Sequence, residues 1–237
     1  MTKQHPILLL HGALGDANTM KPLARSLEEQ GFNTHTLNFS GHGGAAFAES
    51  FGIARFVTET AQYIKKRKLG PVRIFGYSMG GYVALCLAAK EPSLVHSVMT
   101  LGTKFAWSPT SAAQEVKMLN PDKIEEKVPR FAMQLSERHE PNDWKEVMRK
   151  TKDMMLVLGD TPPLSETILS LIQQPALVCR GSEDAMVTEE ESQKAASALE
   201  NGSYHILPDV VHPIEKVQPA AIVEEAVRFF SLQNQEA

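Results

Sequence analysis

The chain has 237 residues, with 24 basic and 28 acidic side chains and a formal net charge of −4. Apolar residues make up 43% and charged residues 22%, values that exclude wholesale disorder, collagen and coiled coil. The small net charge gives no electrostatic basis for a nucleic-acid or membrane-surface partner. The two cysteines, Cys86 and Cys179, exclude a disulfide scaffold and a cysteine-based zinc site.

The apolar runs of the sequence are short. The longest, 7–10 and 83–89, fall well below the roughly 18 residues that cross a bilayer. The apolar stretch near the N-terminus is also shorter than the about 7–15 residues of a signal peptide. We therefore expect a cytoplasmic protein with no membrane association and with reduced cysteines.

The first half of the chain alternates short apolar runs with longer amphipathic ones. Strands are predicted where the apolar run is short and bounded by Pro or Gly, and helices where apolar residues recur every three or four positions. In chain order the predicted elements are strand 6–10, helix 18–30, strand 32–39, helix 51–68, strand 72–75, helix 81–90 and strand 95–101.

This alternation stops after residue 105. Residues 106–170 have a helical apolar period throughout, with Pro129 expected to break or kink one helix. The alternation then returns. The predicted elements of this last stretch are strand 176–179, helix 189–199, strand 203–207 and helix 214–232.

This order predicts an α/β fold with a mostly parallel central sheet and helices on both faces. The core is expected to comprise residues 1–105 and 171–237. The helical insertion, residues 106–170, follows one strand and precedes the next, so it should lie over the carboxyl ends of the strands. Open α/β sheets bind their ligands at that edge.

One short motif points to catalysis. Gly76-Tyr77-Ser78-Met79-Gly80 lies between a predicted strand and a predicted helix and fits the pattern G-x-S-x-G. A strand-to-helix turn this tight needs very small residues at both flanking positions and strains the central residue. Ser78 would then project from the turn at a helix N-terminus, where the dipole favours developing negative charge. We predict that Ser78 is a nucleophile.

A serine nucleophile needs a base. His212 lies in a loop after the last strand and before the terminal helix, with Pro213 predicted at the first helical position, so it can reach the carboxyl edge of the sheet. The other seven histidines have ordinary structural interpretations: His5, His11, His35, His42, His96, His139 and His205. His212 is therefore the predicted base.

The base needs a carboxylate that orients it. Asp184 follows the strand 176–179 at the same edge, and the order Ser78, Asp184, His212 is the order expected for this architecture. Glu183 is the main competitor. Asp209 lies too close in sequence to His212, and Asp160 lies in the helical insertion.

An oxyanion hole needs two backbone N–H groups. Met79, directly after the nucleophile, is predicted to supply one. The loop His11-Gly12-Ala13-Leu14-Gly15-Asp16 is predicted to supply the other, from Ala13 or, less favourably, from Leu14. His11 is interpreted as a structural residue that holds this loop by hydrogen bonds.

Taken together, these motifs resemble the α/β-hydrolase fold superfamily, in its serine-nucleophile form with a helical cap domain. The resemblance rests on HGALGD, SGHGG, GYSMGG, GSEDAMV and VHP, and it extends from residue 11 to residue 213, outside the insertion. It implies that residues 106–170 form the cap that selects the substrate. We expect Leu14, Tyr77 and Met186 to line the pocket.

The superfamily hosts esterases, lipases, thioesterases, C–C bond hydrolases, perhydrolases and lyases, so the fold alone does not fix the substrate. We predict hydrolysis of small to medium carboxylic esters, without cofactor or metal. HGALG with GYSMGG is also similar to a menaquinone-pathway synthase that eliminates pyruvate, but Tyr82 stands where that family commonly has an arginine. Such a lyase, a C–C bond hydrolase and a non-catalytic receptor-like member remain alternatives. A small-molecule partner is expected, and the sequence leaves the oligomeric state open.

Overall fold

A computed structural model describes residues 5–232. Six parallel strands form one sheet in the order β2-β1-β3-β4-β5-β6. The strands are β1 (Ile7–Leu10), β2 (Thr34–Leu37), β3 (Val72–Tyr77), β4 (Val95–Leu101), β5 (Ala176–Glu183) and β6 (Gly202–Val211). The order reverses direction at β1, since the chain first adds β2 on one side and then β3 to β6 on the other. Binding sites of open parallel sheets form at such a reversal.

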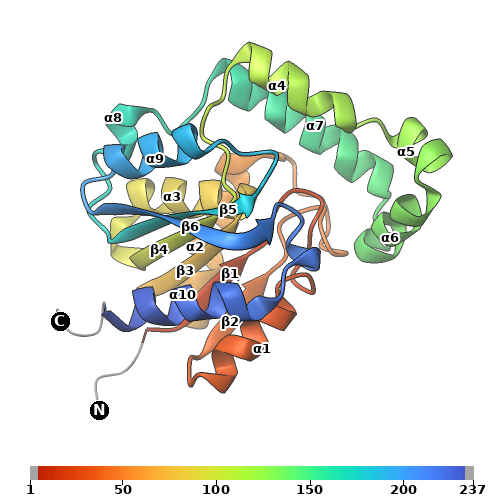
Figure 1. The fold of residues 1–237 in the computed structure, drawn as a ribbon. Coiled ribbons are helices and arrows are strands. Elements are labelled where there is room, and N and C mark those ends of the chain that lie inside the picture. Colours follow the sequence, from red (N-terminus) through yellow and green to blue (C-terminus); the bar gives the residue numbers. More distant parts are fainter. Residues whose placement is uncertain (1–4, 233–237) are drawn as a thin grey trace.

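Helices cover both faces of the sheet, as Figure 1 shows. One face packs against α1 (Lys21–Glu29) and α10 (Pro219–Leu232), and the other against α2 (Ile53–Arg67), α3 (Met79–Lys90) and α9 (Glu189–Ala198). The central strands β1 and β3 are buried along their whole length, because side chains on both of their faces meet a helix layer. The predicted α/β class and parallel sheet are therefore correct.

The segment between β4 and β5 is a helical insertion. Its helices are α4 (Pro109–Glu115), α5 (Pro121–Lys127), α6 (Pro129–His139), α7 (Trp144–Asp160) and the short α8 (Glu166–Leu169). Proline occupies the first turn of α4, α5 and α6, and Pro129 separates α5 from α6 as expected. In Figure 1, α4 and α7 lie across the top of the molecule, with α5 and α6 at one end.

One predicted helix boundary is wrong. The terminal helix was expected from residue 214 with Pro213 at its first position, but residues Ile214–Lys216 form only a short 3₁₀ turn (η3) and α10 begins at Pro219. A proline disfavours helical geometry in the residue before it, so Pro219 prevents a helix from running through Gln218. The short 3₁₀ turns η1 (Pro92–Leu94) and η2 (Val116–Met118) complete the elements.

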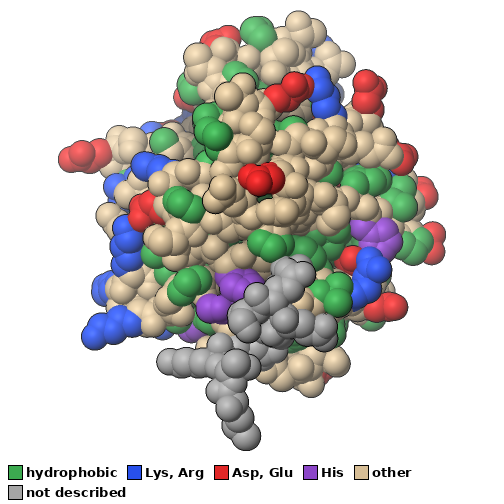
Figure 2. Space-filling model, turned by 90° about the vertical axis from the view of Figure 1, so that its left-hand side faces the viewer, with side chains coloured by type: hydrophobic (Ala, Val, Ile, Leu, Met, Phe, Trp, Pro, Cys, Tyr) green, Lys and Arg blue, Asp and Glu red, His purple; other side chains and the backbone are tan. Residues whose placement is uncertain are grey.

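On the face that Figure 2 shows, Lys and Arg side chains lie mainly along the left edge, and Asp and Glu side chains lie along the top and both edges. In the described part of the chain, no helix is both long enough and apolar enough to cross a membrane.

Candidate active site

Ser78 occupies the turn between β3 and α3 in a strained conformation. Its φ and ψ angles are 51° and −117°, values that residues with a side chain seldom adopt. A Cβ atom added at Gly76 would overlap the backbone of Gly81, and one added at Gly80 would overlap the carbonyl of Leu10. Glycine is therefore required on both sides of Ser78, because only glycine lets α3 pass this close to β1 and β3.

Asp184 and His212 are hydrogen-bonded to each other. His212 Nδ1 lies 2.8 Å from Asp184 Oδ2, and the other carboxylate oxygen accepts the backbone N–H groups of Met186 (2.8 Å) and Val187 (3.0 Å). Burial by itself would raise the pKa of Asp184, but the hydrogen bond and charge of His212 and these two N–H groups lower it below its ordinary value. Asp184 is thus an ionised acceptor that fixes the ring of His212.

Gly102 makes this pair possible. It directly follows β4, has a φ of 61°, and a Cβ atom there would lie 3.0 Å from Asp184 Oδ2 and 3.2 Å from His212 Nδ1. A larger residue would both strain the backbone and press on the pair.

The structure brings Ser78 and His212 to one pocket, whose wall both residues line. Among the residues that the structure describes, the Ser78 hydroxyl has no hydrogen-bond partner. Catalytic hydrogen bonds are often long in a free enzyme and tighten when substrate binds. Ser78, Asp184 and His212 can therefore act as nucleophile, orienting acid and base.

The loop after β1 lies directly against Ser78. Gly12 to Gly15 form a tight turn closed by a 3.1 Å hydrogen bond from Gly15 N–H to Gly12 O, and Leu14 within it has a φ of 57°. A Cβ atom on Gly12 would lie 3.2 Å from that of Ser78. Across residues 5–232, neither Ala13 N–H nor Met79 N–H donates to a protein acceptor. Two such free donors beside a nucleophile could bind an oxyanion.

His11 holds this loop in place. Its Nδ1 donates to Gly12 O at 2.8 Å, and its Nε2 accepts Phe39 N–H at 3.3 Å. Burial lowers the pKa of His11 to about 4, so the ring is neutral at neutral pH and can do both. This geometry agrees with the structural role predicted for it.

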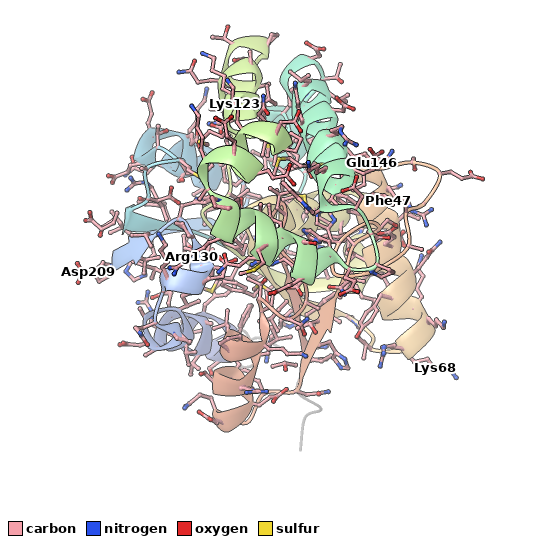
Figure 3. The ribbon with its side chains drawn as sticks, turned by 90° about the vertical axis from the view of Figure 1, so that its right-hand side faces the viewer. Phe47, Lys68, Lys123, Arg130, Glu146 and Asp209 are labelled. Carbon is pink, nitrogen blue, oxygen red and sulfur yellow. The ribbon has the colours of Figure 1, made fainter. Side chains whose placement is uncertain are left out.

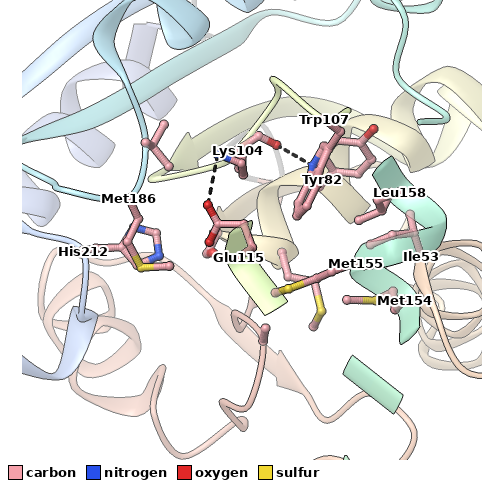
Figure 4. Close-up of a pocket in the computed structure, with 14 residues that line it drawn as sticks. Ile53, Tyr82, Lys104, Trp107, Glu115, Met154, Met155, Leu158, Met186 and His212 are labelled. Carbon is pink, nitrogen blue, oxygen red and sulfur yellow. Dashed lines mark hydrogen bonds and ion pairs between the residues drawn. The ribbon is translucent and has the colours of Figure 1, made fainter. Parts of the chain in front are cut away.

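The pocket is small and mostly apolar, with a volume of about 50 Å³. Its wall comes from the loop after β1, from α2 and α3, from the segment after β4, from α4 and α7 of the insertion, and from the loops after β5 and β6. Figure 4 shows the side chains. The lining residues are Ala13, Ile53, Ser78, Met79, Tyr82, Lys104, Trp107, Glu115, Met154, Met155, Leu158, Met186, Val187 and His212.

Of the three predicted pocket residues, Met186 lines this pocket, whereas Leu14 and Tyr77 are not part of its wall. Leu14, whose φ is 57°, packs instead against a small apolar cluster of the insertion that includes Trp144. Tyr77 is buried below the loop, and its hydroxyl donates to the His212 carbonyl at 2.7 Å.

Sequence reasoning missed two charged residues of the pocket, Lys104 and Glu115. The position of Lys104, three residues after β4 at the carboxyl edge of the sheet, was a usable signal. Glu115 had no such signal, because its place depends on how α4 folds back over the core. Among the described residues, the wall of this pocket includes no arginine. Arg130, for example, lies exposed on α6 (Figure 3).

Burial raises the pKa of Cys86 to about 12 and also raises the pKa of Cys179 well above its ordinary value, so neither thiol forms a reactive thiolate at neutral pH. Within residues 5–232, no group of three His, Cys, Asp or Glu side chains is placed to hold a metal ion.

Comparison with known proteins identifies relatives for much of the chain. The family model described as "alpha/beta hydrolase fold" matches residues 5–150. BpoC of Mycobacterium tuberculosis, whose name designates it provisionally as a non-heme bromoperoxidase, is 24% identical over 95% of this chain and 94% of its own. NosK from Streptomyces actuosus has a similar structure, with a TM-score of 0.83 at 20% identity, covering 98% of this chain and all of its own.

Some relatives match over a shorter stretch. Ethanol acetyltransferase 1 of Kluyveromyces lactis is 32% identical over 38% of this chain. The chain spans only about a quarter of the length of that protein and of two similar yeast acetyltransferases.

Proposed function

The chain belongs to the α/β-hydrolase fold family, and on that premise we propose that it is a serine hydrolase of small to medium carboxylic esters. Ser78 is the nucleophile, His212 the base and Asp184 the orienting acid. The single observation that carries the proposal is the 2.8 Å hydrogen bond between Asp184 and His212 beside a strained Ser78 in one pocket.

The proposed reaction has two stages. In the first, His212 Nε2 takes the proton of Ser78 as its Oγ attacks the ester carbonyl, and the N–H groups of Ala13 and Met79 stabilise the resulting oxyanion. His212 then gives the proton to the departing alcohol, which leaves an acyl group on Ser78. In the second, His212 activates a water molecule that releases the acid and restores the enzyme. Throughout, Asp184 keeps Nδ1 of His212 protonated and stabilises the imidazolium.

We assign the helical insertion, residues 106–170, the role of a cap over a core made of residues 1–105 and 171–237. Support comes from the pocket, since Met154, Met155 and Leu158 of α7 and Trp107 form much of its apolar wall. Flexible thioethers adapt to apolar groups of different shape. A cap built in this way suits an acyl or alcohol group with an apolar portion.

One observation bears on a second candidate function, the elimination of pyruvate. Pyruvate elimination from a dianionic substrate needs cations in the pocket, and Lys104 is a cation in the pocket wall. However, Glu115 lies 3.2 Å from its ammonium and cancels the charge, and the Tyr82 hydroxyl is engaged with the Leu164 N–H at 3.2 Å. These contacts favour a neutral ester over a dianion. C–C bond hydrolysis would use the same three residues, so only the choice of substrate distinguishes it experimentally from ester hydrolysis.

The test combines labelling with turnover. The purified chain should hydrolyse p-nitrophenyl acetate or butyrate in the presence of a chelator and should react with a fluorophosphonate probe at Ser78. Ser78→Ala should lose both. Labelling that survives in Ser78→Ala would refute the assignment, and a panel of esters, thioesters and 1,3-diketones would then define the reaction class.

A further inference from the structure

Two opposite charges face each other inside the candidate pocket. Lys104 Nζ lies 3.2 Å from Glu115 Oε1, and both side chains line the pocket that contains Ser78 and His212. Figure 4 shows the pair between His212 on one side and Trp107 and Tyr82 on the other. Most of the other side chains in the wall are apolar. The pair therefore adds a second polar feature, besides Ser78 and His212, to a mostly apolar wall.

The backbone that carries Lys104 is fixed against the candidate catalytic residues. Of the two preceding residues, Gly102 packs against Asp184 and His212, and Thr103 Oγ1 donates to the Ser78 carbonyl at 2.9 Å. The Lys104 carbonyl in turn accepts Trp107 Nε1–H at 3.1 Å. The backbone of Lys104 is therefore held in a defined position near Ser78, as expected of a residue that recognises substrate.

Stability alone does not account for the pair. The side chains of Lys104 and Glu115 are only 19% and 16% exposed. Removing two charges from water costs free energy that the pairing often only balances, and an apolar pair of similar size can pack at least as well.

The pair is also not needed to hold the insertion to the core, because other contacts do so. Arg138 of α6 donates to the Leu14 carbonyl at 2.8 Å, and Asn142 donates to the carbonyls of Gly41 and Ala45. These contacts hold the insertion to the core without placing any charge in the pocket.

The pair has hydrogen-bonding capacity to spare. A lysine ammonium carries three donors and a carboxylate two acceptor oxygens. Within the described part of the chain, Glu115 is the only carboxylate at ion-pair distance from Lys104, and Lys104 is the only cation at that distance from Glu115. A bound molecule can therefore accept from the ammonium and donate to the carboxylate while the ion pair persists.

We propose that Lys104 and Glu115 form a polar subsite that binds a neutral substrate group able to accept one hydrogen bond and donate another, namely a hydroxyl. The inference rests on the proposed ester hydrolysis and adds the class of substrate. A hydroxyl matches the pair because the two charges cancel. A carboxylate on the substrate would be attracted by Lys104 and repelled by Glu115.

The test compares esters that differ by one hydroxyl group. On the acyl side the two esters are p-nitrophenyl 3-hydroxybutyrate and p-nitrophenyl butyrate, and on the alcohol side they are ethylene glycol monobutyrate and ethyl butyrate. On at least one side, the wild-type kcat/KM should favour the hydroxylated ester by about 10-fold, since two hydrogen bonds contribute about that factor. Lys104→Met/Glu115→Leu should bring the ratio close to one. A merely structural role would change both esters alike and leave the ratio unmoved.

A matched control is the exposed ion pair Arg149–Glu146 on the outer side of α7, at 2.6 Å, where Glu146 is labelled in Figure 3. Arg149→Met/Glu146→Leu should leave the ratio as in the wild type. The single variant Glu115→Gln gives a second readout if the double variant does not fold. Since it frees the charge of Lys104, kcat/KM for p-nitrophenyl hemisuccinate relative to butyrate should rise about 10-fold.

Two results would overturn the proposal of a polar subsite. One is the same ratio of kcat/KM for the hydroxylated and the plain ester in the wild type and in the double variant. The other is a wild type with no preference for the hydroxylated ester on either the acyl or the alcohol side. No gain on hemisuccinate in Glu115→Gln would do the same. In each case ester turnover and labelling at Ser78 would still stand. Loss of those two activities in the wild type would instead refute the proposed function.

Discussion

The Tyr77 hydroxyl donates a 2.7 Å hydrogen bond to the backbone carbonyl of His212. Tyr77 directly precedes Ser78, so this bond ties the strand that carries the candidate nucleophile to the loop that carries the candidate base. Burial and the nearby Glu215 carboxylate raise the pKa of Tyr77, which keeps the hydroxyl protonated as a donor at neutral pH. We therefore expect this bond to fix the position of His212 relative to Ser78.

Tyr77→Phe should lower kcat on p-nitrophenyl butyrate by roughly 5-fold, because one hydrogen bond of about 1 kcal/mol positions the base. KM should change little, since the pocket wall does not include Tyr77. Tyr63→Phe, on α2 beside His35, is the matched control and should retain wild-type kcat. A Tyr77→Phe enzyme with unchanged kcat would show that the bond does not position His212.

Asp184→Asn should keep the fold and lower kcat by roughly 10³ to 10⁴, because the amide favours the wrong tautomer of His212. Glu183→Gln should be nearly silent, since its side chain is exposed and, among residues 5–232, accepts a hydrogen bond from Ser182 Oγ alone, at 3.3 Å. Steady-state kinetics of the two variants decide the assignment. The opposite pattern, with Glu183→Gln severely impaired, would make Glu183 the orienting acid.

The candidate pocket at Ser78 is separated from a larger surface cavity by a wall that includes Ile53, Met154 and Leu158, which line both. The inner pocket has a volume of about 50 Å³ and the outer one about 510 Å³. We therefore expect the wild type to prefer acetyl and butyryl esters over octanoyl esters.

Met154→Ala should join the two cavities and raise kcat/KM for p-nitrophenyl octanoate relative to butyrate by about 10-fold or more. The ratio is the useful measurement, because truncating a buried methionine also costs about 2–5 kcal/mol of stability. Met118→Ala, at a position that is 59% exposed, should leave the ratio unchanged. An unchanged ratio in Met154→Ala would mean that this wall does not limit chain length.

A buried histidine cluster joins the insertion to the core. His139, at the end of α6, accepts Gly43 N–H at 3.1 Å, and its ring packs 5.7 Å from that of His42, which packs 5.1 Å from that of His11. Burial lowers the pKa of His11 and His139 to about 4 each, from an unfolded value near 6.5. Between those pH values the unfolded chain binds protons that the folded chain does not.

The free energy of unfolding should therefore be unaffected by these histidines above about pH 6.5 and should fall as the pH drops toward 4, by about 1.4 kcal/mol per pH unit for each. Urea unfolding across this range measures the slope, and His139→Gln should make it shallower. Asn142→Ala removes a contact with the same loop, without a titrating group, and should lower stability equally at every pH. A slope that His139→Gln leaves unchanged would contradict the assignment.

How far the sequence could predict these features depends on whether the signal is local. The position of Ser78 follows from a glycine spacing within five residues, and those of Asp184 and His212 from the rule that parallel strands end at one edge. The Lys104–Glu115 pair, the Tyr77–His212 bond and the Arg138–Leu14 contact depend on how α4, α6 and the last loop fold over the sheet. Such contacts join residues from 11 to 135 positions apart. No local period encodes them. The start of α10 lies five residues later than predicted because Pro219 disfavours helical geometry at Gln218.

The acyl-enzyme is the most direct test of the central claim. Rapid mixing with p-nitrophenyl acetate should release a burst of p-nitrophenol close to one equivalent of enzyme if deacylation is the slower step. Quenched protein should then carry the mass of one acetyl group on the peptide containing Ser78, and Ser78→Ala should show neither burst nor adduct. Efficient elimination of pyruvate from the menaquinone intermediate, with no adduct on Ser78 and only trace ester turnover, would contradict the account.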